Sequence, residues 1–151
     1  MTRWTLRDAT PADHDGLVFL WLESFARSKF SQRAAIETMR EHKARIWTEL
    51  HGVVRWLLER ERVLVLCDPQ NAGIIWAFAC SGAGRLHYVM VKDRFVDWRE
   101  EMLLALLGAM PLDGVAYSFQ SADYIEVFGA MPSGWRFDPH LPARLILEAA
   151  A

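Results

Sequence analysis

The chain has 151 residues, of which 52% are hydrophobic and 24% charged, with a formal net charge of −2 at pH 7. This composition predicts one globular domain over residues 1–151, excludes a disordered chain, and gives no electrostatic signal for nucleic-acid binding. No apolar run reaches the length of a membrane span and the N-terminus lacks the apolar segment of a signal peptide, so we expect a cytoplasmic protein.

The first predicted elements are a strand and a helix. Residues 4–7 alternate apolar and polar side chains, as a half-buried strand does. Thr10, Pro11 and Asp13 then have the residue types of a helix start, with Thr10 as N-cap and Asp13 as the capping-box acid. The predicted helix carries apolar residues at helical spacing: Leu17, Leu20, Trp21 and Phe25.

A longer helical region follows over residues 31–62, which contain no proline and one glycine, Gly52. Apolar residues recur there mostly at helical steps. Two arrangements remain open for this region, namely two helices divided near residues 31–38 or a bend near Gly52.

Three β-rich runs then occur in close succession, over residues 63–67, 74–80 and 86–91. Turn-forming residues separate the runs, at 68–73 and at 81–84, and short turns of this kind predict an antiparallel meander. Cys67 and Cys80 lie within the first two runs, and we expect both to be reduced core residues.

The remaining chain alternates between helix and strand. The predicted elements are a helix over 98–107, a strand over 115–119, a helix over 121–128 and an edge strand over 135–137. In chain order, all these elements predict an α/β (α+β) fold with a mixed, mainly antiparallel central sheet of about six strands flanked by helices.

Four segments resemble a known family. They are LRDATPADHDGLVFLWLESF (6–25), HGVVRWLLERERVLVLCDPQNAGIIWAFAC (51–80), LHYVMVKDRF (86–95) and GWRFDPHL (134–141). In this order they are similar to the GNAT superfamily of N-acetyltransferases, and in particular to its bacteriophage-type branch. The resemblance implies a GNAT-like fold with an acetyl-CoA site beside the fourth strand.

The sequence departs from that family where active members bind the diphosphate of the coenzyme. Their loop reads Gln or Arg, two residues, Gly, one residue, then Gly or Ala, so that backbone N–H groups can approach the phosphates. Here the three positions fall on Val96, Arg99 and Glu101, and none keeps the family type. Residues 85–107 contain no glycine, so a shifted alignment does not restore the motif.

The same stretch fits a capped helix instead. Asp97 has the residue type of an N-cap, and Glu100 lies where a capping-box acid reaches back. Together with Glu101, these carboxylates would repel a diphosphate. We therefore expect the diphosphate site to be lost and no cofactor to be bound, with acetyl-CoA as the cofactor only if the site survives in another form.

Three hypotheses for function follow from the resemblance and from this departure. The favoured one is a non-catalytic binding or accessory module of phage type, with a protein partner. The alternative is a divergent but active acyl-CoA N-acyltransferase that holds its donor through the fourth strand. A third is an oligomerising structural subunit, in which the abundant Trp and Phe side chains supply a homo-oligomer interface.

Candidate site residues are assigned for the case of an active enzyme. The candidate catalytic residues are Tyr124, Tyr88 and His87. Because side chains alternate along a strand, at most one of His87 and Tyr88 lines a cleft. The candidate cofactor-binding residues are Val89, Met90, Val91, Arg94 and Arg99. No Cys/His cluster has the spacing of a metal site.

Overall fold

The structure, a computed structural model, describes residues 3–28, 31, 38–110 and 115–151. The strands are β1 (Thr5–Asp8), β2 (Arg62–Asp68), β3 (Asn71–Gly82), β4 (Arg85–Val91), β5 (Ala116–Tyr117) and β6 (Arg136–Phe137). The α-helices are α1 (His14–Arg27), α2 (Met39–Arg60), α3 (Arg99–Gly108), α4 (Ala122–Phe128) and α5 (Leu141–Ala150). Two 3₁₀ turns, η1 (Pro11–Asp13) and η3 (Asp93–Trp98), precede α1 and α3.

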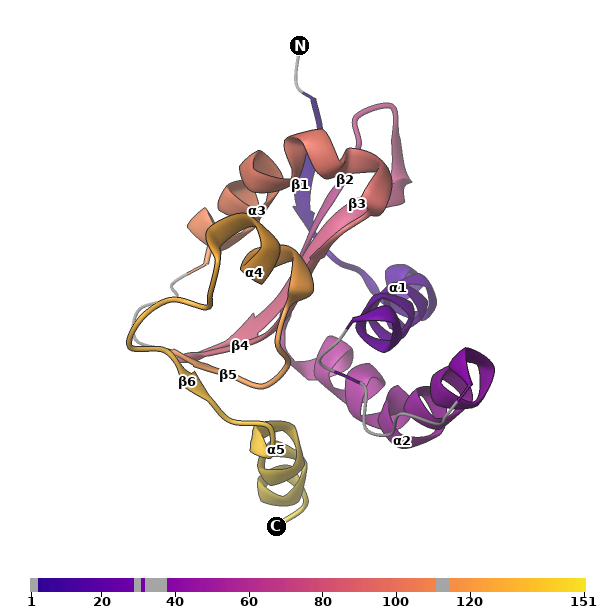
Figure 1. The fold of residues 1–151 in the computed structure, drawn as a ribbon, viewed down its shortest axis with the longest axis vertical. Helices are drawn as coiled ribbons and strands as arrows, with labels where there is room; N and C mark the ends of the chain where they lie inside the picture. Colours follow the sequence, from indigo (N-terminus) through magenta and orange to yellow (C-terminus); the bar gives the residue numbers. More distant parts are fainter. Residues whose placement is uncertain (1–2, 29–30, 32–37, 111–114) are drawn as a thin grey trace.

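All the strands form one six-stranded sheet in the order β1-β2-β3-β4-β5-β6 (Figure 1). Pairing is antiparallel from β1 to β4 and parallel between β4, β5 and β6. The predicted meander and the predicted mainly antiparallel sheet are both confirmed.

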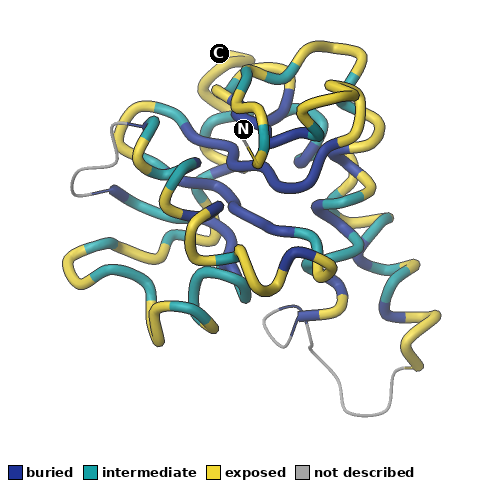
Figure 2. The backbone as a smooth tube through the Cα atoms, turned by 90° about the horizontal axis from the view of Figure 1, so that it is seen from above, coloured by how far each residue is buried: buried dark blue, intermediate teal, exposed yellow. Residues whose placement is uncertain are grey.

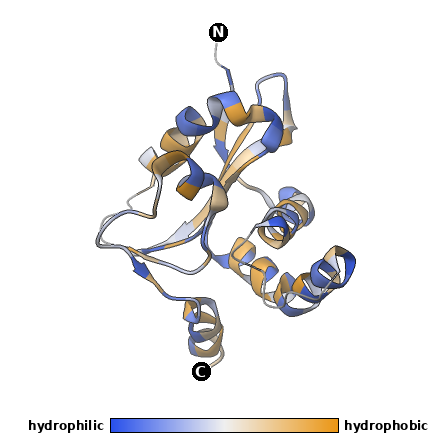
Figure 3. Cartoon of the chain, viewed as in Figure 1, coloured by the Kyte–Doolittle hydropathy of each residue, from blue (hydrophilic) through white to orange (hydrophobic). Residues whose placement is uncertain are grey.

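Helices cover both faces of this sheet, because successive side chains of a strand point to opposite faces. On one face, α1 and α2 pack over side chains such as Val65 and Phe78. On the other, α3 and α4 pack over Leu66 and Val89. Figure 2 shows the buried strands at the centre of the molecule. Figure 3 shows that the helices carry both hydrophobic and hydrophilic residues.

The helix starts follow the expected chemistry in the first half of the chain. The backbone N–H of Thr10 donates to Asp13 Oδ2 at 2.8 Å, which is the reach-back bond of a capping box. Thr38 caps α2, accepting from the Glu41 N–H at 3.1 Å. Helix α2 then runs unbroken through Gly52, so the bend there is excluded; residues 32–37 lie outside the described part of the chain.

The prediction that Asp97 caps the next helix is wrong. Residues 93–98 form the 3₁₀ turn η3, and α3 begins at Arg99 without a side-chain cap. The reason is tertiary packing: Phe95 is buried against Trp76 with ring centroids 4.5 Å apart, which draws these residues into a tight turn. The sequence analysis also missed α5 after β6.

Candidate functional site

The candidate site forms where β4 and β5 separate. The two strands pair over Arg85–Leu86 and Ala116–Tyr117. The last backbone hydrogen bond between the two chain segments joins the Phe119 N–H to the His87 oxygen at 3.1 Å. Beyond His87, β4 continues to Val91 without a neighbouring strand on this side, so its backbone groups there need other partners.

Side chains at the start of α4 supply those partners. Ser121 Oγ donates to the Val89 oxygen at 2.6 Å, and the Val91 N–H donates to Asp123 Oδ2 at 2.9 Å. Ser121 is positioned for this because it is also the N-cap of α4, accepting from the Tyr124 N–H. The two side chains thus replace a strand along the open edge of β4.

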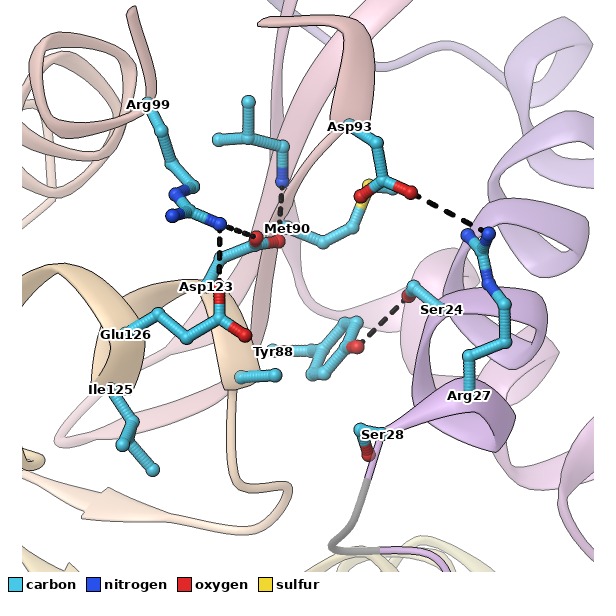
Figure 4. Close-up of a pocket in the computed structure, with 12 residues that line it drawn as sticks. Ser24, Arg27, Ser28, Tyr88, Met90, Asp93, Arg99, Asp123, Ile125 and Glu126 are labelled. Carbon is cyan, nitrogen blue, oxygen red and sulfur yellow. Dashed lines mark hydrogen bonds and ion pairs between the residues drawn. The ribbon is translucent and has the colours of Figure 1, made fainter. Parts of the chain in front are cut away.

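A pocket of about 370 Å³ lies beside this edge, between α1, β4 and α4 (Figure 4). It is lined by Ser24, Arg27, Ser28, Tyr88, Met90, Val91, Asp93, Arg99, Ala122, Asp123, Ile125 and Glu126. Residues from five elements therefore meet at one cavity.

Two groups of charged side chains flank the pocket on opposite sides (Figure 4). On the α4 side, Arg99 Nη1 lies 2.7 Å from Glu126 Oε2 and 3.4 Å from Asp123 Oδ1. On the α1 side, Arg27 pairs with Asp93 at 3.5 Å. Burial raises the pKa of Asp123, although the Val91 N–H and Arg99 oppose that rise.

Tyr88 is the candidate catalytic residue that the structure places at this pocket. Its hydroxyl lies 2.9 Å from Ser24 Oγ of α1, and its ring stacks on Trp21. Burial raises the pKa of Tyr88 far above that of a free tyrosine, so the phenol stays protonated at neutral pH.

His87 lies elsewhere, in a buried polar cluster. Its Nδ1 is 2.8 Å from Ser118 Oγ, and its Nε2 is 3.6 Å from Glu61 Oε2. Arg85 holds the same Glu61 carboxylate with two hydrogen bonds, of 2.7 and 3.1 Å. Burial favours the neutral acid, but the His87 and Arg85 contacts outweigh it and lower the pKa of Glu61 to about 2.

Tyr124 also lies away from the pocket, on the other face of the sheet. It packs against Phe128 and Trp135, with ring centroids 4.7 and 6.4 Å away. The three candidate catalytic residues are therefore not brought together: Tyr88 lines the pocket, while His87 and Tyr124 do not.

The candidate cofactor-binding residues divide in a similar way. Met90, Val91 and Arg99 line the pocket. The Val89 side chain packs in the core beneath α3, and the Arg94 guanidinium lies over the Phe95 ring at 4.8 Å. A ligand in the pocket would therefore meet the side chains of the first three residues and not those of Val89 and Arg94.

The turn that follows β4 is filled by aromatic side chains. Phe95 stacks on Trp98 at 6.0 Å and packs against Trp76 in a tilted arrangement, and Trp98 in turn contacts Trp4 at 6.5 Å. This is the position at which the resemblance places the glycine loop for a diphosphate. The buried Phe95 ring therefore determines the path of the backbone here.

The candidate site residues assigned from the sequence did not include Ser121 or most of the pocket lining, Ser24 and Asp123 among it. Ser121 carries the local signal of an N-cap, but that signal says nothing of its second bond, to Val89. Asp123 bonds a backbone group 32 residues away. Among the residues described, no three His, Cys, Asp or Glu side chains converge on a possible metal position.

Comparison with known proteins finds a likeness in structure but none in sequence. No protein-family model matches the chain, and no curated protein matches its sequence. A GCN5-related N-acetyltransferase from Rhodopseudomonas palustris aligns over 85% of this chain and 80% of its own, with 16% identity and a TM-score of 0.50. The predicted GNAT-like fold class is therefore confirmed.

The apo form of YjaB from Escherichia coli also aligns, over 70% of this chain, with 16% identity and a TM-score of 0.49. The aligned part spans 63% of the length of YjaB. Within the described residues, no helix has both the length and the apolar character needed to cross a membrane.

Proposed function

We propose that this chain is a non-catalytic binding module built on the GNAT fold, an accessory protein of phage type rather than an acyltransferase. One observation carries the proposal. The β4 groups beside which an acyl-CoA arm would lie are already bonded within the chain, Val89 by Ser121 and Val91 by Asp123. A coenzyme would have to break both bonds before it could pair with this strand.

The charges around the pocket support the same proposal. Arg99, which lines the pocket, is held by two carboxylates, those of Asp123 and Glu126. Asp93 adds a third carboxylate to the lining. A diphosphate would meet these negative charges without a glycine loop to bind it.

The active-enzyme alternative keeps one observation in its favour. The pocket lies where the β4 and β5 strands separate, and Met90, Val91 and Arg99, which the resemblance assigns to the coenzyme, all line it. An acyl-CoA could bind there if α4 moved away and freed Val91. The two proposals thus differ on whether α4 stays in place.

Calorimetric titration with acetyl-CoA, paired with an assay for free coenzyme A in the presence of amine acceptors, tests the proposal. We expect neither binding at micromolar concentration nor release of the thiol. The variant Asp123→Ala, which removes the hydrogen-bond partner of the Val91 N–H, is titrated with acetyl-CoA in the same way. If acetyl-CoA bound the unaltered protein in the micromolar range, the non-catalytic proposal would fail.

A further inference from the structure

A second pocket, of about 240 Å³, lies between the C-terminal half of α3, α4 and the turn before β6. Helices α3 and α4 lie side by side there, on the face of the sheet opposite to α1 and α2 (Figure 1). The pocket is lined by Leu104, Leu107, Met110, Tyr124, Phe128 and Trp135. None of these residues lines the pocket beside β4, so the two cavities are separate sites.

Large apolar side chains are exposed at this second pocket. Leu104 and Phe128 both line it, and they are 55% and 38% exposed. Contact between apolar surface and water is unfavourable in proportion to the area exposed. An apolar molecule that entered the pocket would remove part of this surface from water, and binding would gain the corresponding free energy.

The polar atoms of the lining side chains belong to uncharged groups. Tyr124 and Trp135 carry a hydroxyl and an indole N–H, and the Met110 sulfur accepts a hydrogen bond from Ser81 Oγ at 3.2 Å. Burial raises the pKa of Tyr124, so its phenol is neutral at neutral pH. An ion that entered this pocket would lose water without meeting an opposite charge on the described lining side chains. The lining therefore favours an uncharged ligand.

Three of the lining side chains are aromatic. Tyr124 packs against Phe128 with ring centroids 4.7 Å apart and against Trp135 at 6.4 Å, and the planes of the latter pair differ by 25°. Aromatic rings attract one another by more than their buried area accounts for, through offset-stacked and edge-to-face contacts. A cavity of about 150 Å³ holds one benzene ring, so the larger volume here has room for two fused rings.

We propose that this second pocket binds an uncharged, planar aromatic molecule of about two fused rings, which packs against Tyr124 and Trp135 with Leu104 at the rim. The inference goes beyond the proposed function and does not depend on it, because the site shares no lining residue with the pocket beside β4. Tyr124 then has a binding role here in place of the catalytic role that the resemblance suggested.

Calorimetric titration of the full chain with 2-naphthol, decahydro-2-naphthol and 2-naphthoate tests the ligand class. The three share one bicyclic carbon skeleton and differ in aromaticity or in charge. We expect 2-naphthol to bind about tenfold more tightly than either of the others, because only it is both aromatic and uncharged. Equal affinity for 2-naphthol and either of the others, or no binding of 2-naphthol, would overturn the inference.

Two matched variants locate the site. Leu104→Glu replaces an apolar contact at the rim by a charged group and should weaken 2-naphthol binding about fivefold. Leu147→Glu makes the same change on α5, outside the pocket, and should leave the affinity unchanged. Both leucines are more than half exposed, so both variants should fold, which circular dichroism checks. Equal affinity of the two folded variants for 2-naphthol would contradict the assignment.

The Trp135 side chain gives a second measurement on the unaltered chain, which decides the case if Leu104→Glu does not fold. We expect the indole N–H resonance of Trp135 to shift saturably during titration with 2-naphthol, because its ring lines the pocket. The indole N–H of Trp56, on α2 at the opposite face of the sheet, should not shift. A Trp135 resonance that stayed in place while 2-naphthol bound would place the ligand elsewhere and overturn the site.

Discussion

Ser121 Oγ donates a 2.6 Å hydrogen bond to the backbone oxygen of Val89, across 32 residues of chain. Ser121 Oγ also caps α4, because it accepts a hydrogen bond from the Tyr124 N–H. One buried hydroxyl therefore both caps a helix and bonds the open edge of a strand. This relationship fixes α4 against β4 and determines which groups face the pocket.

Ser121→Ala should lower the free energy of unfolding by about 2 kcal/mol, because it removes an N-cap and leaves the buried Val89 oxygen without a donor. Urea unfolding followed by circular dichroism measures the change. Ser133→Ala, at an exposed position, is the matched control and should change stability by less than about 0.5 kcal/mol. Equal effects of the two substitutions would show that the Val89 contact contributes nothing.

Replacement of Gly82 and of Gly52 by alanine should change the stability of the fold in opposite directions. A Cβ at Gly82 would lie 1.8 Å from Glu61 Oε2 and 2.7 Å from Arg85 Nε, so Gly82→Ala must displace this partly buried ion pair. We expect a loss of about 1 kcal/mol, because the ends of both side chains can shift. At Gly52, on the exposed side of α2, nothing lies within 4 Å of the position that a Cβ would take, and Gly52→Ala should stabilise by about 0.5 kcal/mol. Thermal unfolding of both variants checks the two signs.

The Glu61 carboxylate predicts a pH dependence of stability. Its pKa falls from 4.5 to about 2 in the folded protein, so the unfolded chain binds a proton more readily. The resulting stabilisation is present above about pH 4.5 and is lost as the pH falls through about 2, with a size on the order of 3 kcal/mol.

Glu61→Gln isolates this contribution. The difference in the free energy of unfolding between the unaltered protein and Glu61→Gln should be largest above about pH 5 and should shrink towards about pH 2. Urea unfolding at a series of pH values measures it. A difference that stayed constant over this range would exclude Glu61 as the group responsible.

Phe95→Ala should cost about 3 kcal/mol, because the ring is buried between Trp76 and Trp98 and anchors the 3₁₀ turn. Phe19 lies on α1 with 53% of its surface exposed and serves as the control, because the same substitution removes the same side chain there. Its replacement by alanine should cost less than about 1 kcal/mol. Comparable losses in chemical denaturation would mean that Phe95 does not anchor the turn.

The sheet could be predicted from sequence because its signals are local. Short β-rich runs and the turn residues between them, such as those at 68–73, specify β2, β3 and β4 without knowledge of the rest of the chain. The turn after β4 could not be predicted in the same way. Asp97 fits an N-cap by residue type, yet the packing of Phe95 on Trp76, 19 residues earlier, places it inside a 3₁₀ turn.

The candidate site was predictable in part for the same reason. The residues of β4 that line the pocket are Tyr88, Met90 and Val91, and they follow from the position of that strand in the predicted order. Asp123 does not, because its role depends on how far β5 separates from β4 and on where α4 then begins. The spacing of residues along the chain predicts neither the separation of the two strands nor the position of α4 relative to β4.

Nitrogen-edited NMR of the Val91 amide during titration with acetyl-CoA tests most directly whether α4 excludes the coenzyme. Its N–H donates to Asp123 and lies on the edge that an acyl-CoA arm would use. We expect its resonance to stay in place up to millimolar acetyl-CoA, because the Asp123 bond persists. A saturable shift of the Val91 amide at micromolar coenzyme, without a matching shift of the β1 amides at the opposite edge of the sheet, would contradict this and indicate a working acyl-CoA site.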